Sequence, residues 1–175
     1  MSDKNLSKYL SLILRHKPEI AGITLDANGW ADVKSLLAGA KIDFETLERI
    51  VRENDKQRFS FNADKTKIRA NQGHSIKVDV ELEEKVPPEF LYHGTIERNA
   101  TSIESNGILK GMRLYVHLSA DVETAEKVAA RRKGNKVIYK ISAQIMNCDG
   151  YKFFQSKNGV WLTEFVPPKY FTRLN

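Results

Sequence analysis

Apolar side chains recur every three or four residues near the start of the chain, which is the spacing of one face of a helix. The pattern predicts helices over residues 5–16 and 32–37 and a further helix that begins at Asp43. Pro18 ends the first helix because proline restricts the residue before it. Asp43 can accept backbone N–H bonds as the N-cap of its helix.

Alternating residues follow these helices and predict a hairpin. Residues 58–61 form its first strand, 62–64 its turn and 65–70 its second strand. Side chains alternate along a strand, so Lys65, Lys67 and Arg69 are expected on one face. Helices followed by a basic hairpin predict a winged-helix-like lobe over residues 1–80. Such lobes bind either nucleic acid or proteins, since a fold does not fix a function.

The next segment, residues 81–89, has the composition of a linker. It contains the acidic residues Glu81, Glu83 and Glu84 and the stiff pair Pro87-Pro88. Beyond it, short strands are expected at 90–92, 114–118, 137–141, 151–154, 160–162 and 170–171, and helices at 96–105 and 122–132. The predicted fold class is therefore α+β, with a second lobe over residues 90–175.

Composition adds a few limits. The 175 residues are 41% hydrophobic, which allows a proper core, and the net charge of +6 weakly favours a polyanionic partner. The lone cysteine, Cys148, excludes a disulfide framework and a cysteine-rich metal site, and we expect it to be buried. The amino terminus has no apolar signal core and no stretch is long enough to span a membrane, so we expect a soluble, cytoplasmic monomer.

Each of the four histidines stands in a short polar cluster rather than an apolar stretch. They are His16, His74, His93 and His117. Arginine binds phosphate through a planar fork, and histidine can hold or give a proton near neutral pH. The spacing of the histidines does not suit a metal site, so no metal is expected. The pattern indicates phosphate chemistry, with RNA or a nucleotide as the anion.

Two of these clusters lie in the first lobe. Arg15 and His16 stand at the carboxyl end of the first helix, where cations also favour the helix dipole, and this explains the pair about as well as a function does. After Arg69, a polar loop reads Asn71, Gln72, Gly73, His74 and Ser75. Because loops often carry sites and glycine permits close backbone approach, we favour a functional role for this loop.

The other two clusters form a matched pair in the second lobe. His93-Gly94-Thr95 follows one predicted strand and His117-Leu118-Ser119 stands at the end of another, where they could cradle a ribose and a phosphate. The chain has no dinucleotide-binding G-x-G-x-x-G and no Walker motif. The run Arg131-Arg132-Lys133, by contrast, has the usual composition of a solvated helix end.

Together these motifs resemble the RNA 2′-phosphotransferase family Tpt1/KptA. The resemblance covers nearly the whole chain and rests on Leu14-Arg15-His16, Gly29-Trp30, residues 68–75, residues 91–95, His117-Leu118-Ser119 and residues 159–163. The run Arg-Ala-Asn-Gln-Gly-His at residues 69–74 is its most specific part.

The resemblance implies a winged-helix RNA-binding lobe, an ADP-ribosyltransferase-like lobe that binds NAD, and an EC class 2 transferase. In its reaction an internal RNA 2′-phosphate, as at a tRNA splice junction, attacks C1″ of the nicotinamide ribose and nicotinamide leaves. The ribose O2″ of this RNA-2′-phospho-ADP-ribose intermediate then attacks phosphorus. The products are RNA with a free 2′-OH and ADP-ribose 1″,2″-cyclic phosphate.

The resemblance also implies site residues. The catalytic set is Arg15, His16, Arg69 and Arg131, although counting back from Val137 selects Arg132 instead. NAD would contact His93, Gly94, Thr95, His117, Leu118 and Ser119. From the polar loop and the basic hairpin, rather than from the resemblance, we expect RNA phosphates to contact Asn71, Gln72, Gly73, His74, Lys65, Lys67 and Arg132. Val160 stands where many mono-ADP-ribosyltransferases have a glutamate.

This chemistry fits the residues. A phosphate dianion is already a nucleophile, so the first step needs no base. The second step builds negative charge at phosphorus, which arginines stabilise without Mg²⁺, and His16 can donate a proton to the leaving O2′. Three alternatives stay open: an ADP-ribosyltransferase for terminal phosphates or protein, a non-catalytic nucleic-acid binder, and a metal-free RNA-cleaving enzyme with two histidines.

Overall fold

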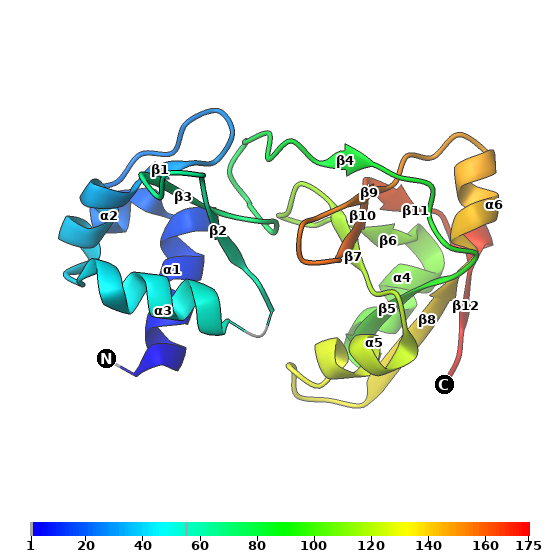
Figure 1. The fold of residues 1–175 in the computed structure, drawn as a ribbon. Helices are drawn as coiled ribbons and strands as arrows, with labels where there is room; N and C mark the ends of the chain where they lie inside the picture. Colours follow the sequence, from blue (N-terminus) through cyan, green and yellow to red (C-terminus); the bar gives the residue numbers. More distant parts are fainter. Residues whose placement is uncertain (1, 55) are drawn as a thin grey trace. The chain divides into compact units, whose positions relative to one another are not determined.

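The computed structural model of the chain describes residues 2–54 and 56–175 (Figure 1). The chain forms two compact units that divide between Glu81 and Leu82. Both contain helices and small sheets, which confirms the α+β class. No helix among the described residues has the length and apolar character needed to cross a membrane.

The first unit combines helices with a small antiparallel sheet. Its elements are α1 (Asp3–Arg15), the 3₁₀ helix η1 (Pro18–Ala21), β1 (Ala31–Asp32), α2 (Val33–Ala40), α3 (Phe44–Glu53), β2 (Phe59–Phe61) and β3 (Lys67–Ala70). The strand order is β1-β3-β2. The predicted helices and hairpin are therefore confirmed, and Asp43 caps α3 by accepting a 2.7 Å bond from the Thr46 N–H.

The core of this unit fixes the end of α1. The apolar face of α1 is buried through Leu6, Leu10, Ile13 and Leu14, and it packs with Phe59 and Ile68 of the hairpin. Burying such side chains stabilises the packing by roughly 1.5–3 kcal/mol each. The last turn of α1, which ends at Arg15, is thereby held against the sheet.

The second unit has more and shorter strands. Its elements are β4 (Glu83–Glu84), β5 (Leu91–Ile96), η2 (Glu97–Asn99), α4 (Ala100–Asn106), β6 (Ile108–Leu109), β7 (Val116–Leu118), α5 (Val122–Ala129), β8 (Lys136–Ile141), α6 (Ala143–Cys148), β9 (Phe154–Gln155), β10 (Trp161–Thr163), β11 (Phe165–Val166), η3 (Pro168–Tyr170) and β12 (Phe171–Arg173). The strand orders are β4-β9-β10-β7, β11-β6 and β12-β8-β5.

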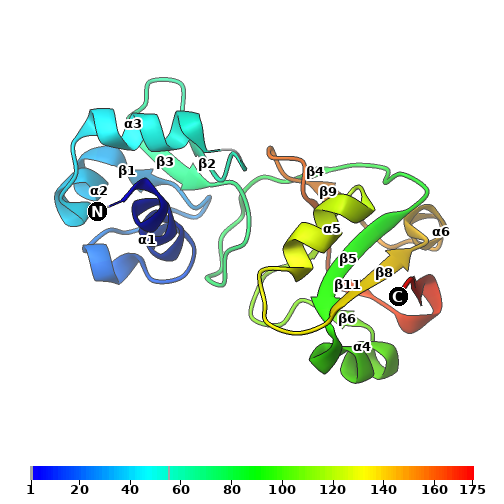
Figure 2. The same ribbon diagram turned by 90° about the horizontal axis from the view of Figure 1, so that it is seen from below.

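Helix α5 lies across β5 and β8 (Figure 2). The approach is so close that a Cβ on Gly94 would stand 1.9 Å from the Ala125 carbonyl oxygen. Ala125 and Ala129 of α5 pack there on Ile138 of β8. The glycine of the His93-Gly94-Thr95 motif is thus required by the packing of a helix on a strand.

Several predicted boundaries were wrong. Strand β5 continues to Ile96, so the motif at residues 93–95 lies inside the strand and does not follow it, whereas His117 lies in β7, near the end of the strand predicted at 114–118. The sequence did not predict that β5 continues through Gly94, because glycine usually interrupts a strand pattern. Helix α5 ends at Ala129, before the arginine pair at residues 131–132.

Two further expectations in the second unit need correction. Part of the predicted linker, Glu83 and Glu84, is a strand that pairs with Phe154 and Gln155. Cys148 ends the unpredicted helix α6 and is exposed, not buried.

Candidate functional site

The carboxyl end of α1 is joined to the loop that follows β3. The Ser75 N–H donates to the Arg15 carbonyl at 3.0 Å, and a 2.9 Å hydrogen bond joins His16 Nδ1 to Ser75 Oγ. Gly73, with φ of +90°, lies against the Arg15 side chain, because a Cβ there would stand 3.6 Å from Arg15 Nη1. Two motifs that are distant in sequence therefore form one structure.

Arg69 is held rigidly beside them. Its side chain is almost fully buried; Nη1 donates to Glu81 at 2.8 Å and to the Asn28 carbonyl at 3.3 Å. The guanidinium stacks on the Trp30 ring at 4.3 Å, a cation–π contact. The Gly29-Trp30 motif therefore serves to orient Arg69.

His74 lies at the centre of this group. It is only 1% exposed, and its pKa is lowered to about 4 by burial and by the positive charges of Arg15, His16 and Arg69. A hydrogen bond to the Leu14 backbone opposes that shift. The Nε2 atom has no partner among the described residues. At neutral pH His74 is therefore a neutral imidazole.

These observations define a cationic cluster in the first unit: Arg15, His16, Arg69 and His74. The electrostatic influence of the first three on His74 shows that the residues lie close together. Arg15 and His16 stand at the end of α1, Arg69 stands in β3, and His74 lies in the loop after β3. Guanidinium groups of fixed orientation beside histidines can bind a phosphate and stabilise charge on it.

Other predicted phosphate contacts have different surroundings. Asn71 is buried; its amide donates to the Gln57 carbonyl at 2.6 Å and accepts from Ser60 Oγ at 2.8 Å. Its side chain therefore shapes the loop. Gln72 is half-buried in the same loop.

The hairpin lysines are ion-paired. Lys65 stands in the turn before β3, with φ of +57°, and its Nζ lies 2.5 Å from Glu48. Lys67 in β3 pairs with Asp26 at 3.0 Å. The expectation that both belong to one strand face was wrong for Lys65, because the turn extends through it.

In the second unit the two histidine motifs lie side by side. Tyr92 and Ser119 form an antiparallel bridge with N–H to carbonyl bonds of 2.9 and 2.8 Å. Beside it, His93 Nδ1 donates to the His117 carbonyl at 3.1 Å. Burial lowers the pKa of His93, and the charges of Arg132 and Arg113 lower it further. The matched motifs are thus in contact; the first lies within β5, whereas the second stands at the end of β7.

The remaining predicted NAD contacts are partly structural. Thr95 is buried and its Oγ1 accepts from Asn99 Nδ2 at 2.9 Å. Leu118 belongs to the apolar core and Gly94 packs under α5. His117 is half-buried, with Nδ1 3.1 Å from the Tyr115 carbonyl oxygen.

Arg113 is a functional candidate that the sequence did not reveal. Burial lowers its pKa, and so do the charges of Arg132 and Arg131. Three guanidinium groups and His93 therefore gather in the second unit. Arg113 stands in an irregular segment before β7, and no motif marks it. Within the described residues no group of three or more potential metal ligands occurs.

Comparison with known proteins gives the same family throughout. The family profile described as RNA 2′-phosphotransferase, Tpt1 / KptA family, matches residues 1–165. A protein of Fusobacterium nucleatum named "Probable RNA 2′-phosphotransferase" is 55% identical, over 97% of this chain and 97% of its own length. Proteins of the same name from Flavobacterium johnsoniae and Hahella chejuensis are 52% and 50% identical, over 95% and 98% of this chain and 94% and 95% of their own lengths. The chain belongs to the RNA 2′-phosphotransferase Tpt1/KptA family.

Proposed function

We propose that this protein is an NAD-dependent RNA 2′-phosphotransferase that transfers an internal RNA 2′-phosphate to NAD. The observation that carries the proposal is the cluster of Arg15, His16 and Arg69 around the neutral imidazole of His74. It is built from the motifs that are most specific to the family. The relatives' name, RNA 2′-phosphotransferase, agrees with it.

The first unit would be the RNA-binding lobe. The proposal that this lobe is a winged helix is supported by its element order, α1-β1-α2-α3-β2-β3, and its sheet order, β1-β3-β2. The cationic cluster would bind the 2′-phosphate. Arg69 suits this role because the stacked Trp30 ring fixes its guanidinium before any ligand binds. A group oriented in advance loses little entropy on binding.

The second unit would be the ADP-ribosyltransferase-like lobe that binds NAD. The residues fit that ligand: Arg113, Arg131 and Arg132 offer guanidinium groups suited to a pyrophosphate. His93 gives its Nδ1 proton to the His117 carbonyl, and in the neutral ring Nε2 is then an acceptor. Such an acceptor can take a hydrogen bond from a ribose hydroxyl.

In the first step the RNA 2′-phosphate would displace nicotinamide from C1″ of NAD. One phosphate oxygen forms the bond to C1″, and the C1″–N bond breaks with its electron pair leaving on nicotinamide. Arg15 and Arg69 would hold the phosphate. Burial of His74, together with the positive charges of Arg15 and Arg69, lowers the pKa of His74 and keeps its imidazole neutral.

In the second step O2″ would attack phosphorus, with its hydroxyl proton passing to solvent, and the RNA O2′ would leave. The arginines would stabilise the negative charge that builds on the phosphoryl oxygens; a single contact of this kind typically contributes about 10²–10³ in rate. His16 would donate the proton that O2′ needs. The hydrogen bond between its Nδ1 and Ser75 Oγ would orient the ring for this transfer.

The test is incubation with an RNA that carries one internal 2′-phosphate, with and without NAD, followed by mass analysis. We expect RNA with a free 2′-OH and ADP-ribose 1″,2″-cyclic phosphate, formed only with NAD. Equal phosphate removal without NAD would refute the proposal. An ADP-ribosylated 5′- or 3′-terminal phosphate, with the internal phosphate untouched, would instead support transfer to terminal phosphates.

A further inference from the structure

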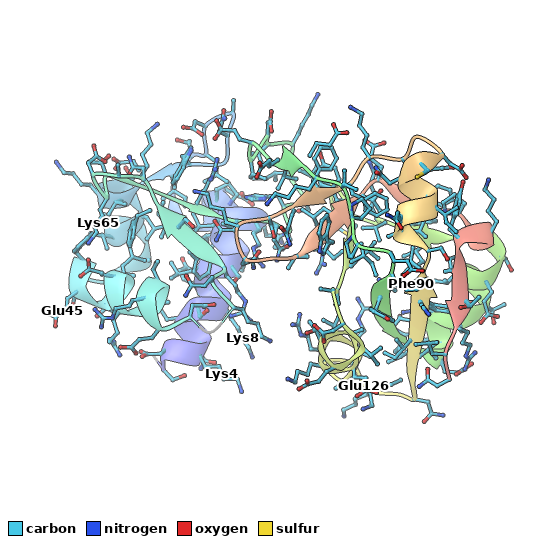
Figure 3. The ribbon with its side chains drawn as sticks, turned by 45° about the vertical axis from the view of Figure 1, so that its right-hand side comes forward. Lys4, Lys8, Glu45, Lys65, Phe90 and Glu126 are labelled. Carbon is cyan, nitrogen blue, oxygen red and sulfur yellow. The ribbon has the colours of Figure 1, made fainter. Side chains whose placement is uncertain are left out.

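A groove runs along the exposed side of α1 in the first unit. Its volume is about 740 Å³, and its wall includes Lys4 and Lys8 of α1, His16 directly after that helix, and Lys56 and Arg58. It therefore begins near the amino end of α1 and reaches a member of the cationic cluster. Figure 3 shows Lys4 and Lys8 projecting from neighbouring turns of this helix.

The lysines and His16 share one face of α1. Lys4, Lys8, Leu12 and His16 follow one another at intervals of four residues, and residues spaced by four are neighbours on a helix surface. The distance from Lys4 to His16 along the helix axis is roughly 18 Å at about 1.5 Å per residue. That length is roughly five nucleotides of a stacked strand at about 3.4 Å each.

The charges that line the groove favour an anion. Its cations are Lys4, Lys8, Lys56 and Arg58, and its carboxylates are Asp3 and Glu53. Each carboxylate is already ion-paired with an arginine that does not line the groove: Asp3 with Arg49 at 2.5 Å and Glu53 with Arg52 at 3.2 Å.

Lys4 and Lys8 differ from the lysines of the hairpin. In the described part of the chain neither has an acidic partner, and both are exposed. Lys65 and Lys67 are paired with Glu48 and Asp26. Figure 3 also shows Lys65 on a different edge of the first unit from Lys8. A phosphate that approaches Lys65 or Lys67 must displace a carboxylate, whereas one that approaches Lys4 or Lys8 need not.

We propose that this groove binds the sugar-phosphate backbone of the RNA that flanks the 2′-phosphate, independently of its sequence. The inference rests on the proposed function, since it assigns a path to the RNA whose 2′-phosphate meets His16. Lysines act as point charges on phosphates and do not read bases, so RNAs of different sequence should bind alike. The path replaces the hairpin as the RNA-binding surface of the first unit.

The first experiment measures binding of 2′-phosphorylated RNAs, with at least six nucleotides on each side of the modified ribose, at several salt concentrations. The Lys4→Gln/Lys8→Gln protein is compared with the wild type and with Lys65→Gln/Lys67→Gln, which removes the same charge. For a single strand, each lost phosphate contact lowers the slope of log K against log salt by about 0.7, so two contacts give about 1.4. We expect that decrease, with binding weakened about tenfold at low salt, only in the Lys4/Lys8 variant.

A decrease of that size in the hairpin variant, or an equal decrease in both, would overturn the proposal, as would an unchanged slope in the Lys4/Lys8 variant. Thermal melting checks that both variants are folded. A charge reversal, Lys8→Glu, should weaken RNA binding more than the neutral change Lys8→Gln. If the role of Lys8 were purely structural, the two variants would show the same salt dependence of binding.

A second experiment separates this proposal from the proposed function. Turnover is measured with the long RNA and with a dinucleotide that carries the 2′-phosphate but is too short to lie along the groove. The Lys4/Lys8 variant should raise KM for the long RNA about tenfold more than for the dinucleotide. Equal effects on both substrates would contradict the groove. If the wild type acts on neither substrate, the proposed function fails, while the salt slopes still decide where RNA binds.

Discussion

His16 and Ser75 stand 59 positions apart in the sequence, yet a 2.9 Å hydrogen bond joins the Nδ1 of one to the Oγ of the other. The Ser75 N–H also donates to the Arg15 carbonyl. These two bonds connect the end of α1 to the loop after β3. The orientation of the His16 ring therefore depends on the loop, and the Ser75 hydroxyl is a positioning group in the proposed reaction.

Replacing Ser75 with Ala should slow the second step more than the first. Loss of one hydrogen bond of about 1–1.5 kcal/mol corresponds to roughly tenfold in rate. In single-turnover reactions we expect the Ser75→Ala protein to accumulate RNA-2′-phospho-ADP-ribose. Ser35→Ala is a matched control, because it removes a hydroxyl that bonds to Asp32 at the start of α2, away from the cationic cluster. A variant in which both steps keep the wild-type rate would contradict the role of Ser75.

The ion pair between Glu81 and Arg69 should oppose phosphate binding. The carboxylate lies 2.8 Å from the same guanidinium that would hold the 2′-phosphate, and it is itself exposed. We expect Glu81→Gln to tighten binding of a 2′-phosphorylated RNA about tenfold, which is about 1.4 kcal/mol. Glu48→Gln, which releases Lys65, should leave the affinity unchanged. Weaker binding by Glu81→Gln would show that the carboxylate is needed to hold Arg69 in place.

His74 should make the protein less stable in acid. Its pKa is about 4 in the folded protein and near the ordinary histidine value of 6.5 in the unfolded chain, so below pH 6.5 the unfolded chain takes up a proton that the folded protein does not. Stability therefore falls as pH drops from about 6.5 to about 4. Between pH 7.5 and pH 5 the loss from this group is about 2 kcal/mol.

Urea denaturation at these two pH values measures the effect. The free energy of unfolding should change by less in His74→Gln than in the wild type, and the difference isolates His74 because all other titrating groups are shared. An identical pH dependence in the two proteins would mean that His74 is not held neutral.

The arginine pair after α5 can be resolved by two single variants. The charge of Arg132 influences both His93 and Arg113, whereas Arg131 is a neighbour of Arg113. If Arg131 stabilises the transition state of the second step, Arg131→Ala should lower the rate of that step by a factor of about 10²–10³. Arg132→Ala should then mainly weaken substrate binding. The reverse result in rapid-quench kinetics would transfer the catalytic role to Arg132.

Gly94 should matter for stability rather than for ligand contact. A Cβ at this position would overlap the Ala125 carbonyl oxygen, so Gly94→Ala must push α5 away from β5. Overpacking of this kind typically costs about 1–3 kcal/mol. Calorimetry should show a lower melting temperature for the variant, and an unchanged one would contradict the close packing.

Much of the first unit could be predicted from the sequence. Its helices carry clear apolar faces, and Asp43 and Pro18 mark boundaries by local chemistry alone. The contact between Arg69 and Trp30 could not be predicted, because it depends on how β3 and the turn at Gly29 meet in space. The ion pairs of Lys65 and Lys67 were missed for the same reason. RNA binding was therefore expected on the hairpin, and the groove along α1 was overlooked.

The second unit was harder to predict because its strands are short. Strand β5 contains a glycine, and β4 and β6 have only two residues each, too few for an alternating pattern. The two histidine motifs were recognised as a pair, and their contact through Tyr92 and Ser119 confirms that they lie together. Arg113 shows the limit of motif analysis, since only the folded chain brings it near Arg132.

The most direct test of the account is the stoichiometry of the reaction. An RNA with a single radiolabelled internal 2′-phosphate is incubated with the protein and NAD, and both the released nicotinamide and the RNA 2′-OH are counted over time. We predict one nicotinamide for each phosphate removed, with the entire label in ADP-ribose 1″,2″-cyclic phosphate. Label appearing as inorganic phosphate, or 2′-OH formed without nicotinamide release, would contradict the account.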